Sequence, residues 1–109
     1  MSKPFDLGGM GNILEQARTM QDRLQAMQEE VGARVVEGSA GGGMVRVEIT
    51  GKLEVRRITI EENVYADHDR EMLQDLVAAG VNDAIRKAQK MMADEMAQLT
   101  GGIALPGFG

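Results

Sequence analysis

Three basic residues in the C-terminal part of the chain, Arg86, Lys87 and Lys90, follow one another without an intervening acid. If this stretch is helical, Lys90 lies about one turn after Arg86, so the cations gather on one side of the helix. Guanidinium and ammonium groups placed together in this way can neutralise the phosphates of a nucleic acid backbone. The alternative is an ordinary solvated face, in which Asp83 pairs with Lys87 and Asp94 with Lys90 across one turn.

Two further cations, Arg18 and Arg23, lie in a helical pattern near the N-terminus and are the next candidates for phosphate contacts. Each has an acid nearby, Glu15 or Asp22, which weakens its positive field. The same arrangement fits a solvated helix face, so both interpretations stay open for this pair.

Arg56 and Arg57 lie in a predicted strand, where they can face DNA or pair with Glu48 or Glu54 across a hairpin. No predicted element offers side chains suited to reading base edges. Binding to DNA is therefore expected to rest on backbone contacts and on DNA shape.

The sequence contains no catalytic constellation. It has no cysteine, and therefore no thiolate nucleophile, disulfide or cysteine-based zinc site. His68 is the only histidine, and a metal site or general base beside Asp67 and Asp69 would need partners that the chain does not supply. We interpret His68 as a surface loop residue, and we expect no enzyme, no cofactor, no metal and no small-molecule substrate.

The composition fits one soluble domain of 109 residues. The net charge is −5 and the pI is about 4.8, so any polyanion must meet local basic patches rather than a generally basic surface. Aromatic residues make up only 3% of the chain, which is too few for a platform that stacks single-stranded bases. No apolar run reaches the ~18 residues of a membrane span, so we expect a cytoplasmic protein without a membrane partner.

The longest pattern in the chain is an apolar stripe with spacings of three and four, which predicts a helix over residues 68–100. The stripe consists of Leu73, Val77, Val81, Ile85, Ala88, Met92, Met96 and Leu99. At ~1.5 Å per residue this helix is roughly 45 Å long, whereas a compact body of this size is only about 26 Å across. The helix must therefore project or lie against a partner. Residues 101–109, GGIALPGFG, are expected to form a flexible tail.

Another helix is predicted over residues 12–31, after a flexible glycine-rich arm over residues 1–11. Asn12 and Glu15 resemble a capping box at its start, and Gly32 suits its C-terminal end. Its apolar residues form a heptad seam, typical of a helix that packs against another helix. The seam consists of Ile13, Ala17, Met20, Leu24, Met27 and Val31, with Met10 in phase if the helix starts earlier.

Between the helices the apolar period changes to two, which predicts a three-stranded meander over residues 33–60. Strands are expected over 33–38, 45–50 and 53–60, with a glycine-rich loop after the first and a two-residue turn at Gly51-Lys52 after the second. The last strand changes apolar phase near Arg56. Either a bulge shifts the phase, or both faces of the strand meet apolar surface. We favour the second interpretation, with helices on one face and the sheet of a second subunit on the other.

Residues 61–69 are expected to form an acidic loop, from which Asp67 or Asp69 caps the long C-terminal helix. The prediction is an α+β protein, a single domain over residues 1–109 of order α-β-β-β-α. Two long helices flank a small antiparallel three-stranded sheet. Because three strands cannot cover both apolar stripes, we also expect a two-fold homodimer with projecting helices.

Three segments together resemble the YbaB/EbfC family of bacterial nucleoid-associated proteins. They are residues 8–30 (GGMGNILEQARTMQDRLQAMQEE), the strand VRVEITG at 45–51 after a glycine-rich loop, and residues 71–89 (EMLQDLVAAGVNDAIRKAQ). The ending ALPGF, at residues 104–108, is also similar to the tail of this family. Family members often carry lysines along the first helix, where this chain has Glu15 and Ala26.

The resemblance implies a dimer joined through its sheet and adjoining helices, with paired helices that project like the arms of a tweezer. It also implies binding of duplex DNA, with bridging or compaction of DNA in the nucleoid and an effect on gene expression. We therefore predict a homodimeric nucleoid protein that contacts double-stranded DNA through Arg18, Arg23, Arg86, Lys87 and Lys90.

The alternative is a protein-interaction adaptor. The same dimer would hold another protein with its Met-rich helices and its apolar tail, without significant DNA affinity. The acidic pI favours this alternative, whereas the resemblance and the local basic cluster favour DNA binding.

Overall fold

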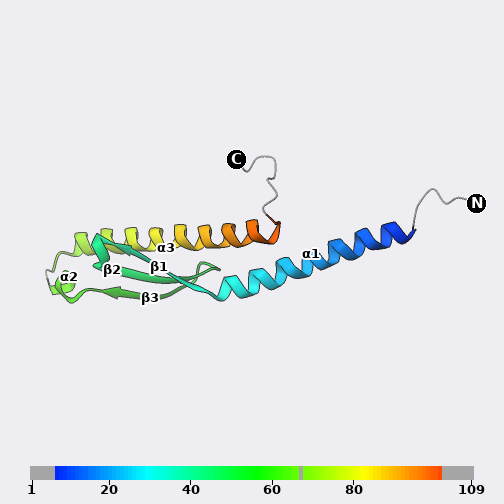
Figure 1. The fold of residues 1–109 in the computed structure, drawn as a ribbon. Helices are drawn as coiled ribbons and strands as arrows, with labels where there is room; N and C mark the ends of the chain where they lie inside the picture. Colours follow the sequence, from blue (N-terminus) through cyan, green and yellow to red (C-terminus); the bar gives the residue numbers. More distant parts are fainter. Residues whose placement is uncertain (1–6, 67, 102–109) are drawn as a thin grey trace, which may run out of the picture.

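The chain folds into an elongated molecule of 84 × 26 × 17 Å, in which one long helix lies along a small sheet and the other extends beyond the end of that sheet (Figure 1). This computed structural model describes residues 7–66 and 68–101. The elements follow in the order α1 (Leu7–Ala33), β1 (Val35–Ala40), η1 (Gly41–Gly43), β2 (Val45–Thr50), β3 (Val55–Ile60), α2 (Glu62–Ala66) and α3 (Arg70–Leu99). The predicted α+β order of helix, three antiparallel strands and helix is confirmed. The predictions for the ends at 1–6 and 102–109, and for a cap at Asp67, lie outside the described residues.

Helix α1 begins at Leu7 rather than at Asn12, so residues 7–11 are helical and the predicted flexible arm is wrong there. The apolar seam explains the difference, because it continues in phase from Ile13 back to Met10. Asn12 consequently lies inside the helix, and the predicted capping box does not mark its start.

The C-terminal end of α1 also lies further along the chain, at Ala33, so Gly32 does not stop the helix. A Cβ on Gly32 would lie 2.9 Å from two carbons of the Lys52 side chain, and a Cβ on Gly51 would overlap the Val31 carbonyl. The absence of side chains at both glycines lets the end of α1 sit against the connection between β2 and β3.

The strands form one antiparallel sheet in the order β1-β2-β3. The predicted two-residue turn after β2 is wrong, because the connection runs from Gly51 to Glu54. Leu53, rather than Gly51, has the positive φ of this connection, at 66°. Thr50 helps to hold the longer connection, since its hydroxyl accepts a hydrogen bond from the Glu54 N–H at 3.2 Å.

A β-bulge in β3 accounts for its change of apolar phase. Glu48 of β2 pairs with Arg57, but the next residue, Ile49, pairs with Val55, which leaves Arg56 without a partner in the ladder. Paired residues lie on the same face of a sheet, so the apolar residues of β3 all lie on the face of Ile49. The interpretation that we favoured, apolar surface on both faces of this strand, is therefore wrong.

The outer face of the sheet is polar. It carries Arg46 and Glu48 from β2 and their ladder partners Thr59 and Arg57 from β3. A second subunit's sheet would meet mainly charged and polar side chains on this face, so the apolar surface on which the expected stacking of two sheets was based is not present there.

Helix α3 begins with the capping that the sequence predicts at Asp69. The Asp69 carboxylate accepts a hydrogen bond from the Met72 N–H at 3.0 Å, which satisfies one of the free donors of the first turn. The preceding residues are not simply a loop as expected, because Glu62–Ala66 form the short helix α2. Val64 anchors α2, since only 3% of it is exposed.

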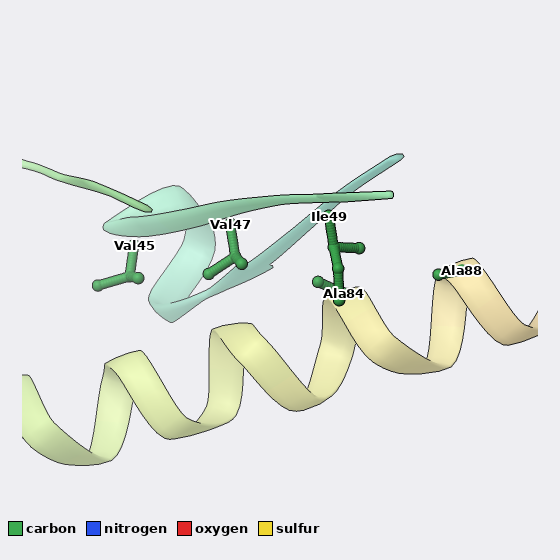
Figure 2. Packing of buried hydrophobic residues seen from close by; sticks show 5 residues of the cluster. All are labelled: Val45, Val47, Ile49, Ala84 and Ala88. Carbon is green, nitrogen blue, oxygen red and sulfur yellow. The ribbon is translucent and has the colours of Figure 1, made fainter. Parts of the chain in front are cut away.

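The core lies between β2 and the middle of α3 (Figure 2). Val45, Val47 and Ile49 point from the inner face of the sheet towards α3, and Ile49 lies next to Ala84. These four residues and Ala88 are buried. The small helix residues bring α3 close to β1 and β2. This close approach fixes the helix and gives the side chains on its open side a rigid base.

Candidate nucleic-acid interface

The three predicted cations of α3 are exposed on this anchored helix. Exposed fractions of the side chains are 68% for Arg86, 53% for Lys87 and 76% for Lys90. Because Ala84 and Ala88 on the same turns are fully buried, the cations project from a helix that cannot easily rotate. The structure thus brings these three residues together as a local group.

Asp83 partly neutralises this group. Its carboxylate lies 3.1 Å from the Lys87 ammonium and 3.7 Å from the Arg86 guanidinium. It also accepts a hydrogen bond from the Ser39 backbone N–H at 2.9 Å, across the contact between α3 and β1. The Ser39 N–H, and then Lys87 and Arg86, hold the pKa of Asp83 below its ordinary value, because each favours the charged carboxylate. Asp83 is therefore a fixed anion beside two of the cations.

Lys90 is paired in the same way, with its ammonium 2.8 Å from the Asp94 carboxylate. The partners are 76% and 60% exposed, so water screens the pair and its strength is small. Both of the i, i+4 pairs of the solvated-face alternative are thus present. A phosphate that binds at α3 must compete with carboxylates that already occupy the cations.

Arg18 and Arg23 lie on a different part of the molecule, the projecting length of α1. Both are exposed, and within the part of the chain that the structure describes neither takes part in an ion pair. The neighbouring acids Glu15 and Asp22 are present in sequence but do not form ion pairs with them. These two arginines are therefore more available to an incoming anion than the cations of α3.

Arg57 forms an ion pair with Glu48 across the hairpin, at 3.6 Å. This is one of the two alternatives predicted for Arg57. Its side chain remains 74% exposed on the outer face of the sheet. Arg56, which has no ladder partner, is also exposed and forms no ion pair among the described residues. This strand therefore adds one neutralised cation and one unpaired cation.

Arg34, directly after α1, contacts the C-terminal part of α3, and the sequence did not predict this contact. Its guanidinium donates to the Glu95 carboxylate at 2.9 Å and lies 3.6 Å from Glu30. Glu95 raises the pKa of Arg34, with a smaller contribution from Glu30. The i, i+4 spacing of Glu30 and Arg34 was visible in the sequence, but the contact with Glu95, 61 residues away, was not.

Within residues 7–66 and 68–101, no group of three potential metal ligands lies together. His68 has φ of 55° and its N–H donates to the Tyr65 carbonyl at 3.2 Å, as part of the link between α2 and α3. No helix of this part of the chain combines the length and hydropathy that a membrane crossing needs.

The architecture defines a class of small proteins in which two long helices bracket a three-stranded antiparallel sheet and one helix extends beyond it. The chain matches the YbaB/EbfC DNA-binding family over residues 7–103, and it belongs to this family, a family of nucleoid-associated DNA-binding proteins. Its fold is similar to the crystal structure of the uncharacterized protein HP0035 from Helicobacter pylori. The TM-score is 0.68 at 21% sequence identity, over 89% of this chain and 99% of that chain.

Proposed function

We propose that this protein binds duplex DNA as a two-fold homodimer, mainly through phosphate contacts, and that it bridges or compacts DNA in the cytoplasmic nucleoid. The observation that carries this proposal is the family match over residues 7–103, together with cations exposed on both long helices. The proposal assigns the protein no catalytic activity, no cofactor and no small-molecule substrate.

The geometry ranks the candidate contacts. Arg18 and Arg23 are exposed without an ion pair among the described residues, so their contacts with phosphate require no exchange of partners. The cations of α3 must first break their ion pairs, which join Arg86 and Lys87 to Asp83 and Lys90 to Asp94. We therefore assign the larger share of DNA affinity to α1 and a smaller share to α3.

A homodimer supports this proposal because it duplicates the cations and covers apolar surface. Large apolar side chains of α1 are exposed in the single chain, among them Ile13 at 66% and Leu14 at 62%. Exposed apolar patches of this kind mark contacts with another protein chain. Two copies related by a two-fold axis would present each cationic group twice, which allows one dimer to contact two segments of DNA.

The test is a titration of a fluorescently labelled duplex at several salt concentrations, followed by anisotropy. Each phosphate contact contributes about 0.9 to the slope of log affinity against log salt. Arg18 and Arg23 from two chains make up to four contacts, so the double variant R18Q/R23Q should flatten the slope by up to about 3.6. The variant R86Q/K87Q/K90Q should flatten it less, because carboxylates already compensate these cations.

The matched control is R56Q/R57Q, which removes two positive charges per chain from the sheet rather than from α1. It should flatten the slope less than R18Q/R23Q does, because Glu48 already compensates Arg57. If R56Q/R57Q weakens binding as much as R18Q/R23Q, general charge and not the α1 site governs binding. If the wild type does not bind the duplex at low salt, the proposed function is wrong.

The compensated cations and the net charge of −5 favour a second candidate, the protein-interaction adaptor. In that case the dimer forms but the duplex titration gives no change of anisotropy at low salt. Sedimentation of the same samples separates the two outcomes, since a dimer of the 11.8 kDa chain without DNA binding supports the adaptor.

A further inference from the structure

Three uncharged polar side chains form a line along the projecting part of α1. Asn12, Gln16 and Thr19 follow one another at spacings of four and three residues, so they lie on one face of the helix. At ~100° per residue, the three directions fall within about 60° of one another. We call these three residues the polar ridge.

The polar ridge is open in the single chain. All three residues are exposed, and among the residues that the structure describes none of their side chains takes part in a hydrogen bond. Asn12 was expected to cap the helix, but α1 begins at Leu7, so its amide does not serve as the cap. Figure 1 shows this part of α1 continuing past the end of α3 and away from the sheet.

The polar ridge lies beside the apolar seam of α1 and does not coincide with it. Each ridge residue is followed directly by a seam residue, roughly 100° further around the helix. These seam residues are Ile13, Ala17 and Met20. A second chain that covers the seam would therefore leave the ridge accessible to another ligand.

The side chains of the ridge match the edges of base pairs in a duplex. A carboxamide donates and accepts at the same time, as the N6 amino group and the N7 of adenine require in the major groove. A threonine hydroxyl can donate or accept there, and its methyl group can pack on the methyl group of thymine. These are uncharged contacts, which distinguish sequences rather than neutralise phosphates.

The dimensions of the helix and the groove also agree. An α-helix is about 10–12 Å wide with its side chains, and the major groove of B-DNA is about 12 Å wide. From Asn12 to Thr19 the helix rises by about 10 Å at ~1.5 Å per residue. This length corresponds to about three base pairs at ~3.4 Å per base pair.

We infer that the polar ridge reads base edges in the major groove of duplex DNA, and that Asn12 and Gln16 recognise adenine. Arg23 continues the line four residues after Thr19 and holds a phosphate, which fixes the position of the ridge along the groove. This inference rests on the proposed function, because the ridge meets DNA only if α1 does. From the sequence we expected backbone contacts and DNA shape alone, and the ridge adds base recognition to them.

Selection from a library of duplexes with a randomised centre tests the inference. The selected duplex and a scrambled duplex of the same composition would then be titrated with the protein at one salt concentration, followed by anisotropy. One good bidentate contact to a base is worth about 5- to 150-fold in discrimination, so the wild type should prefer the selected duplex by about tenfold or more. The double variant N12A/Q16A should bring the ratio of the two dissociation constants close to 1.

The salt slope of N12A/Q16A should remain that of the wild type, because the variant removes no charge. This result separates the ridge from Arg18 and Arg23, whose removal should change the slope. Alanine favours a helix, and both positions are exposed, so the variant should keep α1 intact.

The matched control is Q21A/Q25A, which removes two exposed amides from the opposite side of the same helix. It should keep the preference of the wild type. If it lowers the preference as much as N12A/Q16A does, or if N12A/Q16A keeps the full preference, the inference is wrong.

A base analogue supplies a second measurement. Deazaadenine, which lacks N7, would replace each adenine of the selected element in turn. At one or more positions the analogue should weaken binding of the wild type by about fivefold or more, while N12A/Q16A should not respond to it. Equal losses for both proteins, or no loss for either, would contradict the inference.

The same titrations separate failure of this inference from failure of the proposed function. A wild type that binds both duplexes equally refutes base reading by the ridge and leaves DNA binding in place. A wild type that binds neither duplex at low salt refutes the proposed function, and base reading with it.

Discussion

The close approach of β1 to α3 at Gly38 gives a specific prediction about stability. Gly38 of β1 lies directly under α3, and a Cβ at this position would be 2.5 Å from the Cα and 2.7 Å from the Cβ of Ala84. It would also overlap the Ala84 backbone nitrogen. Gly38→Ala therefore cannot be accommodated by a side-chain rotation, because the obstacle is the backbone of the helix.

The expected cost follows from the movement that the clash requires. Ordinary carbon contacts begin near 3.5 Å, so the helix must move away from the sheet by about 1 Å at this point. A gap of 0.5–1 Å forfeits about a quarter to a half of the dispersion energy over the buried residues of β2. Overpacking of this kind costs typically about 1–3 kcal/mol and occasionally more, and the backbone obstacle places Gly38→Ala at about 3 kcal/mol.

Gly80→Ala is the matched control on the opposite side of the same contact. A Cβ there would lie 3.2 Å from a methyl carbon of Val47 and 3.3 Å from one of Val45, so these side chains need to move by only a few tenths of an ångström. Alanine also favours the helix over glycine by about 1 kcal/mol. These effects oppose one another, so this variant should stay within about 1 kcal/mol of the wild type.

Urea unfolding followed by circular dichroism measures both values, at one fixed protein concentration because the proposed dimer would make stability depend on concentration. Gly38→Ala should lower the free energy of unfolding by about 3 kcal/mol without changing the m-value much. If Gly38→Ala and Gly80→Ala lie within experimental error of each other, the close approach of α3 to β1 does not govern the packing as argued.

Three further predictions concern α3 and its acids. Asp69→Ala removes the N-cap of α3 and should lower the free energy of unfolding in urea by about 1 kcal/mol. Asp69→Asn keeps a capping side chain and should stay close to the wild type. If the two variants lower the stability equally, Asp69 does not act as the cap. Because the folded state lowers the pKa of Asp83, this group stabilises the protein above about pH 4 and loses that effect as the pH falls through its folded pKa. Unfolding of Asp83→Asn should therefore vary less steeply with pH below about pH 4 than that of the wild type, and parallel curves would refute this. In the duplex titration, Asp83→Asn should strengthen binding and steepen the salt slope by up to about 1.8 per chain. Arg86 and Lys87 lose the carboxylate that competes with phosphate, whereas the Ser39 N–H keeps an acceptor. Unchanged affinity would place both cations outside the DNA contact.

Local patterns predicted the parts of the structure that depend on neighbours along the chain. The heptad seam and the longer apolar stripe identified both helices, because residues three and four apart lie on the same face of a helix. The cap at Asp69 and the pairs of Asp83 with Lys87 and of Lys90 with Asp94 are also contacts within one helical turn. Each of them needs only the correct secondary structure.

The features that the sequence reasoning missed depend on which strand residue meets which partner. The bulge at Arg56 was one of two open alternatives, because a change of apolar phase looks the same whether a strand bulges or both faces are covered. The connection after β2 was predicted too short because Gly51 suits a tight turn, whereas Thr50 and Leu53 provide a longer one. Helix ends were also missed where the seam extends further than the capping residues suggest.

By itself the sequence determined the element order, the apolar face of each helix and the ion pairs within α3, because all of these follow from backbone periodicity. Tertiary structure alone decided that α3 covers two strands rather than three, that Arg34 joins Glu95, and that Asp83 is held by the Ser39 N–H. These are contacts between residues far apart in the sequence, and small residues at Gly38, Gly80 and Ala84 allow the close packing of α3 on the sheet. That packing leaves apolar residues in the first half of α1 and on β3 exposed in the single chain.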